Sequence, residues 1–199
     1  MLILLLRIPK LLSLCESVQK WRLCIRPGLD PCWSHPSGAF TCLGDAVHAT
    51  LPYLASGAGM SFEDGAVLGH CLDRLTSKAT VEKKHALAIY EACRRERTEK
   101  VVARGNVQQY LYHLHDGPEQ EARDARMRAF AAMEVAGSAE PATLPEGCVA
   151  GDDPLAWRTN GVGSWLLHYD SVADVEEHWN LGRTTKAVFR TPISQQSSL

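Results

Sequence analysis

The stretch GDAVHATLPYLASGAGMSFED, from Gly44 to Asp64, decides the fold because the chain changes there from an extended segment to a helix. Before it, residues 39–43 form a short run with aromatic and β-branched members between two glycines, which predicts a buried strand. After it, apolar residues recur every 3.6 positions, which predicts a helix from near Gly57 to Leu75. We therefore expect a strand, a loop that carries Pro52, and a helix.

The same stretch offers groups suited to an electron-rich ligand. Gly44 lets the backbone approach a ligand closely, and the carboxylate of Asp45 can accept a hydrogen bond from a ribose or ribityl hydroxyl. Gly57 and Gly59 leave the backbone bare where the helix begins, so its N–H groups and positive dipole end can face the ligand. Taken separately, each pair fits an ordinary turn or tight packing, but their order and spacing together favour a binding site.

Further helices are expected on both sides of this stretch. The spacing of apolar residues predicts a short amphipathic helix between Ile8 and Leu23, followed by a loop over the Pro- and Gly-rich residues 26–38. A long helix should begin near Val81, with Gly105-Asn106 as a point where it can kink or break, and another should run from Pro118 to about Met133. The long helix should turn a solvated charged face outward, formed by Lys83, Lys84, Glu91, Arg94, Arg95 and Arg97.

Composition narrows the class of protein. The chain has 199 residues, of which 45% are hydrophobic and 22% charged, as in a soluble globular protein, and we expect it in the cytoplasm. Its formal charge of -2 argues against a nucleic-acid partner, which requires a basic surface. The apolar run Leu2 to Leu6 is too short for a signal or spanning segment, so we expect a buried or interface surface there and no membrane contact.

The ordered motif resembles the second FAD-binding motif of class A flavoprotein monooxygenases, the salicylate-hydroxylase-like group. In that family a strand is followed by Gly-Asp-Ala, a histidine, a proline, a glycine-bearing loop and Glu-Asp on a helix. Here these residues are Gly44, Asp45, Ala46, His48, Pro52, Gly57, Glu63 and Asp64. The resemblance extends over about residues 11–133, including Trp33 to Gly38 and His115 to Pro118. Over this range the chain resembles the C-terminal part of the family's proteins, in its fungal branch.

The resemblance implies a cofactor site and a reaction. Asp45 would contact the ribityl or pyrophosphate region of FAD, Pro52 would lie beside the flavin ring, and the backbone of Gly57, Ala58 and Gly59 would reach the pyrimidine edge. NADH or NADPH would reduce FAD as co-substrate, and an electron-rich aromatic, phenolic or polyketide-like metabolite would be hydroxylated with oxygen in secondary metabolism. No side chain of the motif is required as a catalytic acid, base or nucleophile, so we assign no catalytic residue.

The resemblance also implies an N-terminal unit with a Gly-rich dinucleotide turn, and no such turn is recognisable in this sequence. We therefore expect an α/β fold class in the form of an α+β remnant, mostly helical with one short strand leading into the motif. Residues 1–136 would form the monooxygenase portion, 137–154 a connector, and 155–199 a docking segment with a frayed tail. Association with a separate N-terminal half is one expectation. The alternative is an inactive remnant or interaction module that does not bind FAD.

Other reactive side chains have simpler interpretations. His48 is expected to be a local hydrogen-bonding or packing residue, and Glu63 and Asp64 to be ordinary complements to the helix dipole. Cys42 and Cys71 should be core residues, since neither has an activating partner nearby in the sequence. His113 and His115 lie on different faces of a helix, and no metal site is predicted from the spacings. The residues between Gly44 and Gly59 thus remain the candidate site.

Overall fold

The chain is described here from a computed structural model, which covers residues 2–135, 152–157 and 162–188. Within these ranges the structure contains helices and one isolated antiparallel bridge, and no strand. The elements are α1 (Leu2–Leu12), α2 (Asp45–His48), the 3-10 helix η1 (Pro52–Leu54), α3 (Gly57–Asp73), α4 (Thr80–Tyr112), α5 (Pro118–Val135), α6 (Gly163–Leu167) and α7 (Ser171–Val188).

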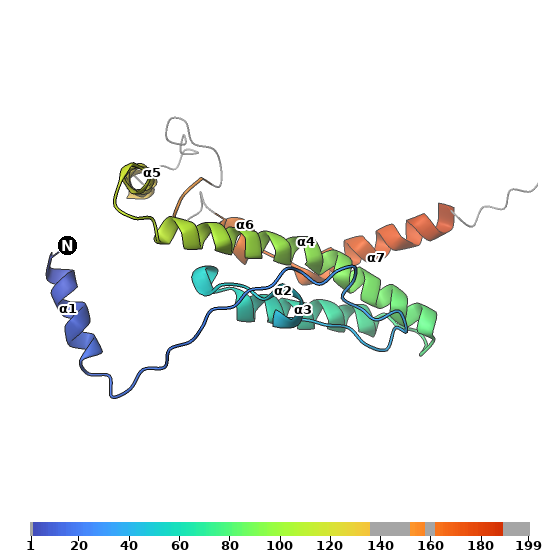
Figure 1. Cartoon of the computed structure of the whole chain (residues 1–199). Coiled ribbons are helices and arrows are strands. Elements are labelled where there is room, and N and C mark those ends of the chain that lie inside the picture. Colours follow the sequence, from blue (N-terminus) through green and yellow to red (C-terminus); the bar gives the residue numbers. More distant parts are fainter. Residues whose placement is uncertain (1, 136–151, 158–161, 189–199) are drawn as a thin grey trace, which may run out of the picture.

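Helices α3 and α4 form the centre of the structure. They lie side by side as an antiparallel pair, and α7 packs against both of them (Figure 1). The turn between α3 and α4 is held by Glu82, whose carboxylate accepts hydrogen bonds from the backbone and side chains of Thr76 and Ser77. Buried apolar side chains also stabilise the pair of helices: Val67 of α3 and Ala86 and Tyr90 of α4 have no exposed surface.

The buried strand predicted over residues 39–43 is wrong for this structure. Ser34 and Thr41 form a single bridge, flanked by hydrogen bonds from His35 N to Phe40 O (2.9 Å) and from Cys42 N to Trp33 O (3.0 Å). The chain reverses between them in a tight turn in which Gly38 has a φ of 71°. A β-strand needs a partner segment that pairs over several residues, and here only one residue pair forms a bridge. The segment is therefore a short hairpin, and Phe40 is 62% exposed.

The helix predicted between Ile8 and Leu23 is also wrong in its bounds. Helix α1 ends at Leu12, and no helix covers residues 13–44. Val18 and Trp21 are more than four-fifths exposed, so the loose apolar spacing finds nothing to pack against, and packing is what stabilises most protein helices. Figure 1 shows α1 apart from α3 and α4. No helix in the described ranges is both long enough and apolar enough to cross a membrane.

The remaining helix predictions fare better. Helix α3 follows the predicted helix from Gly57 to Leu75 closely, and α5 begins at Pro118 as expected. Helix α4 runs unbroken through Gly105-Asn106, so the kink or break that the sequence allows there does not occur. A Cβ at Gly105 would lie 3.5 Å from the Thr50 hydroxyl, so the bare backbone lets the 50–51 loop pack closely and this contact offsets the weak helix propensity of glycine.

Two groups of buried side chains form the core. The larger one joins α3, α4, α7 and the loop before α2, and it consists of Trp33, Val47, Val67, Cys71, Ala86, Ile89, Tyr90, Cys93 and Val175. The smaller one consists of Leu54, Met60, Val101, Ala156 and Leu166. The predicted connector, residues 137–154, lies mostly outside the described residues, and the predicted tail, residues 191–199, lies wholly outside them. The core therefore places the loop from Gly44 to Ser56 across the α3–α4 pair.

Candidate functional site

The backbone turns sharply at Gly44, directly before α2. Gly44 has a φ of 61°, a left-handed conformation that glycine adopts with little strain. Its carbonyl accepts from the N–H groups of Val47 (2.9 Å) and His48 (3.0 Å) and so starts α2. A Cβ at this position would lie 3.0 Å from the Ser61 hydroxyl, so the glycine also allows the turn to sit against α3. The sequence predicts a glycine that lets the backbone approach a ligand closely; in the structure, what the backbone of Gly44 approaches closely is α3.

The carboxylate of Asp64 holds this turn in place from the core. Asp64 is fully buried, and its Oδ2 accepts from Gly44 N (2.8 Å) and from His48 Nε2 (2.6 Å). Its Oδ1 accepts from Arg94 Nε at 2.8 Å. Burial acts to raise the pKa of Asp64, but the hydrogen bonds from His48, Arg94 and Gly44 outweigh it, so this pKa lies below its ordinary value. Asp64 is therefore an ionised buried carboxylate that links α2, α3 and α4.

A second set of ion pairs lies beside the first. Glu63 Oε2 is 2.7 Å from Arg94 Nη2, and Glu63 Oε1 is 2.7 Å from Arg97 Nη2. Arg97 also donates to the carbonyl oxygens of Trp165 and Leu166, and its guanidinium lies 4.2 Å from the centre of the Tyr169 ring. The network thus fixes α6 and the segment before α7 to α4, as well as fixing the loop before α3.

This network changes several sequence-based interpretations. His48 is a buried hydrogen-bonding residue, as expected. Glu63 and Asp64 pair with arginines from α4, so their interpretation as simple dipole complements is wrong. Arg94 has no exposed surface and Arg97 is 8% exposed, so the prediction that they belong to a solvated face is also wrong. Both occur on the same helical face as Tyr90 and Val101, and that spacing was the signal that could have identified them.

The residues predicted to contact FAD lie at the surface next to this network. Asp45 and Pro52 are exposed, as are Ala58 and Gly59 in the first turn of α3, while Gly57 is partly buried. In the described part of the chain, Asp45 has no hydrogen bond, and the N–H groups of Gly57, Ala58 and Gly59 have no acceptor. The side chain of Ser56, the residue before α3, donates to Leu54 O and does not cap the helix. Donors at a helix start without a cap suit an anionic or electron-rich group.

The first turn of α3 is also sterically open. A Cβ placed at Gly59 would meet no atom within 4 Å, whereas one at Gly57 would lie 3.4 Å from a methyl group of Thr50. The residues present therefore fit the flavin edge that the resemblance implies: free amide donors, a free carboxylate and a bare surface. Cys71, by contrast, is a fully buried core residue, and burial raises the pKa of its thiol to about 11.

A cavity of about 440 Å³ lies elsewhere, between α4, α6 and α7. None of the five predicted FAD contacts lines it; instead it is lined by residues such as Cys93, Asp174 and His178. The predicted FAD contacts and this cavity therefore lie at two separate places in the structure.

Comparison with known proteins identifies relatives with named activities. The chain is 37% identical over 158 residues to the FAD-dependent monooxygenase OpS4 of Beauveria bassiana, an alignment that covers 79% of this chain and 33% of that protein. It is 38% identical over 120 residues to 3-amino-4-hydroxybenzoate 2-monooxygenase of Streptomyces cremeus, covering 60% of this chain and 29% of that protein. It is 42% identical over 91 residues to 6-hydroxynicotinate 3-monooxygenase of Pseudomonas fluorescens, covering 46% of this chain and 22% of that protein.

The chain spans about a third or less of the length of these curated relatives. No protein-family model matches it. The relatives are fungal and bacterial, and their names describe FAD-dependent or aromatic monooxygenases. By sequence, this chain is a homologue of part of the FAD-dependent aromatic monooxygenases of the salicylate-hydroxylase-like family.

Proposed function

We propose that the chain supplies one wall of the flavin pocket of an FAD-dependent monooxygenase that uses NAD(P)H and oxygen to hydroxylate a phenolic or polyketide-like aromatic metabolite. The observation that carries the proposal is the open, uncapped start of α3 together with the free carboxylate of Asp45, which follows the Gly44 turn. The named activities of the relatives support the reaction type, since two of them act on hydroxylated aromatic rings.

Each predicted contact has a definite role in this proposal. The N–H groups of Gly57, Ala58 and Gly59, together with the helix dipole, would bind the electron-rich pyrimidine edge of the flavin. Asp45 would accept a hydrogen bond from a ribityl hydroxyl, and Pro52 would present a rigid apolar surface to the ring. FAD, when bound, supplies the redox and oxygen chemistry, while the protein orients it and limits the access of water. The buried Asp64 keeps the Gly44 turn and α3 in register, so it is a positioning residue.

A flavin-binding measurement tests this proposal directly. Titration of the folded chain with FAD should quench flavin fluorescence, and Asp45→Ala should weaken binding by about 10- to 100-fold, the range for losing a hydrogen bond to a charged group. Asp73→Ala, which removes an exposed carboxylate from the other end of α3, is the matched control and should leave the affinity unchanged. Absence of flavin binding by a folded sample would refute the proposal and leave the alternative, a remnant or interaction module without FAD.

The steric requirement can be tested with a pair of glycines on the same helix. A Cβ at either Gly59 or Gly69 meets no atom within 4 Å, so a leucine at either position should be accepted by the fold. Gly59→Leu should block the approach of the flavin edge, whereas Gly69→Leu, at the far end of α3, should not. Equal affinity for FAD in both variants would place the flavin elsewhere.

We also propose that a further part of a monooxygenase fold covers the surface around the site. Large apolar side chains are exposed on and beside α3: Phe62 is 79% exposed, Phe40 62%, Leu72 43% and Leu43 42%. Burial of one such side chain is worth about 1.5–3 kcal/mol, so a covering polypeptide would stabilise the chain. The relatives, of which the chain spans a third or less, contain such additional sequence.

Co-expression can test this association. The part of the Beauveria bassiana relative outside the matched third, expressed as a separate chain, should co-purify with this chain and increase FAD retention. Phe62→Glu should abolish the association, while Val81→Glu, which changes an exposed apolar residue of α4, should not. Failure of the two chains to associate would refute this part of the proposal.

A further inference from the structure

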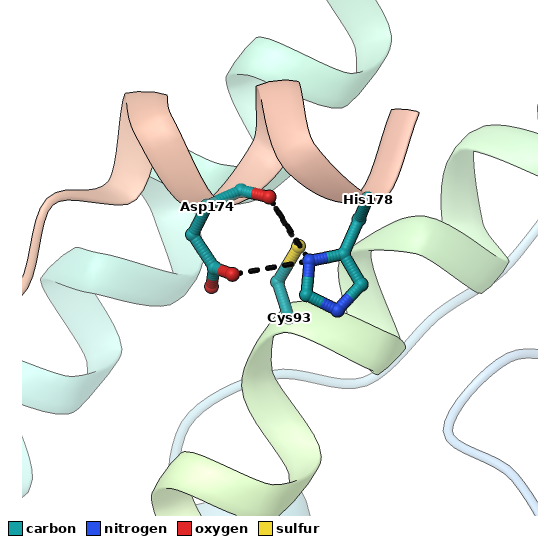
Figure 2. Close-up of side chains that lie close together, drawn as sticks. All are labelled: Cys93, Asp174 and His178. Atoms are coloured by element: carbon teal, nitrogen blue, oxygen red, sulfur yellow. Dashed lines mark hydrogen bonds and ion pairs between the residues drawn. The ribbon is translucent and has the colours of Figure 1, made fainter. Parts of the chain in front are cut away.

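Three side chains that bind metals in many proteins lie together on the wall of the cavity between α4, α6 and α7. Cys93 comes from α4, and Asp174 and His178 come from α7, four residues apart and therefore on one face of that helix. Figure 2 shows the carboxylate and the imidazole of α7 turned toward the sulfur of Cys93. Cys93 is buried, and the side chains of Asp174 and His178 are 22% and 32% exposed.

The distances within this cluster are short. One ligand atom from each of the three residues lies within 4.8 Å of the other two. His178 Nδ1 is 3.0 Å from Asp174 Oδ1 and 3.0 Å from the backbone oxygen of Asp174. The Cys93 thiol donates to that same backbone oxygen at 3.8 Å. The three groups thus converge on one point.

The arrangement does not suit a Cys–His–Asp relay. In such a relay the nucleophile and the carboxylate use opposite nitrogens of the imidazole, so that one nitrogen accepts a proton while the other donates. Here the carboxylate is bonded to Nδ1, and Figure 2 shows the sulfur on the same side of the ring. Convergence of sulfur, oxygen and nitrogen on one point is instead the geometry of a metal site.

We propose that Cys93, Asp174 and His178 bind a zinc ion, with a fourth coordination position open toward the cavity. Zinc accepts thiolate, imidazole and carboxylate ligands together, and sites with three protein ligands leave a position for water or another ligand. Zinc–ligand distances of about 2.0–2.3 Å in a tetrahedron require ligand atoms roughly 3.3–3.7 Å apart. The Nδ1–Oδ1 distance of 3.0 Å is already near this range, and the sulfur, which lies within 4.8 Å of both atoms, needs a shift of at most about 1.3 Å.

Neighbouring groups favour this role. The hydroxyl of Tyr169 donates to Asp174 Oδ2 at 2.6 Å, which orients the carboxylate and leaves Oδ1 for the ion. Glu96, Glu177 and Asp170 also line the cavity. Its two cations have acidic partners, since Lys100 pairs with Glu96 at 2.6 Å and Arg97 pairs with Glu63 at 2.7 Å. The field at the cluster therefore does not repel a cation.

Zinc binding displaces protons from two of the ligand atoms. A coordinated thiol is deprotonated outright, so zinc replaces the thiol proton and that proton passes to solvent. The proton on His178 Nδ1, which faces the two oxygens of Asp174, moves to Nε2 through solvent, so that Nδ1 can bind the ion. The new sulfur–zinc bond joins α4 to α7, which are 81 residues apart at this contact.

Metal titration of the full 199-residue chain tests the proposal. The exposed thiols Cys15, Cys24 and Cys32 are first replaced by serine to remove adventitious ligands. Zinc should then bind with a stoichiometry of one per chain in competition with a chromophoric chelator, and cobalt should give a thiolate-to-metal charge-transfer band. At zinc concentrations about 100 times Kd, Tm should rise by about 5–10 °C.

The variants locate the site. Cys93→Ser and His178→Ala should each lower zinc affinity by at least about 100-fold, and Tyr169→Phe by about 10- to 100-fold. His113→Ala is the matched control, because His113 Nδ1 also lies close to a backbone oxygen one turn earlier, that of Gln109, at 2.8 Å. The zinc affinity of this variant should equal that of the parent. If Cys93→Ser does not fold, the partly exposed His178 still provides the test. No binding at one equivalent, or equal binding by His178→Ala and the parent, would overturn the proposal and indicate an adventitious ion only.

Discussion

Replacement of Asp64 by asparagine should destabilise the protein strongly. Asp64 has no exposed surface, and its two oxygens accept from Gly44 N, His48 Nε2 and Arg94 Nε at 2.6–2.8 Å. Asparagine has nearly the same shape but no charge, and one of its two terminal groups is a donor that would face another donor. The guanidinium of Arg94, also fully buried, would lose one of its two anionic partners.

The expected magnitude follows from this loss. Removing one partner of a buried ion pair costs about 3–5 kcal/mol, because a charge remains buried without full compensation. For a protein of this size, 1 kcal/mol corresponds to roughly 2–4 °C in Tm, so Asp64→Asn should lower Tm by about 6–20 °C. Thermal unfolding followed by circular dichroism measures this directly, because the described structure is mostly helical.

Glu82 provides the control for burial. Its carboxylate accepts hydrogen bonds from Thr76 and Ser77 but lies at the surface, where water replaces lost partners. Glu82→Gln should therefore lower Tm much less than Asp64→Asn. Equal shifts in the two variants would refute the reasoning, since the burial of Asp64 would then contribute nothing beyond its hydrogen bonds.

Three further predictions concern stability. The pKa of Asp64 is lower in the folded state than in the unfolded state, so the stability that Asp64 contributes is complete above the unfolded pKa of about 3.9 and is lost as pH falls through the lower folded pKa. The Tm difference between the parent and Asp64→Asn should therefore narrow below about pH 4. A difference that widens there would contradict this reasoning. Gly44→Ala should cost about 1–3 kcal/mol in chemical denaturation, since alanine disfavours a φ of 61° and its Cβ would lie 3.0 Å from the Ser61 hydroxyl, while Gly65→Ala, where a Cβ meets nothing within 4 Å, should not destabilise. Leu54→Ala should cost about 2–5 kcal/mol by opening a cavity in the smaller core group, because Leu54 is 1% exposed; a cost like that of Leu14→Ala, at a residue 77% exposed, would argue against this packing.

Local patterns predicted the elements that depend on nearby residues. The 3.6-residue spacing after Gly57 predicted α3, and proline in the first turn predicted the beginning of α5. The burial of Cys71 on the apolar face of α3 was likewise predicted, and it is confirmed. These features are set within a few turns of helix, where side-chain period and backbone restriction act directly.

Patterns failed where the outcome depends on a distant partner. The run at residues 39–43 has the composition of a strand, but it forms a single bridge with Ser34, because the described residues contain no segment that pairs with it over several positions. The sequence predicts that α4 can break at Gly105, whereas in the structure its bare backbone receives the 50–51 loop and the helix continues. In the first case the strand propensity had no partner segment to act on, and in the second a tertiary contact outweighed a local propensity worth about 1 kcal/mol.

For the candidate site, the order Gly44, Asp45, Pro52, Gly57 and Gly59 was enough by itself to identify the family, and the flavin pocket that it predicts stays a prediction. Only the tertiary structure decided that Asp64 and Arg94 form a buried ion pair beneath it, since charged side chains are usually exposed unless a partner compensates their desolvation. The tertiary structure alone also brought Cys93 to Asp174 and His178. No spacing in the sequence encodes that contact, because it exists only when the larger core packs α7 onto α4.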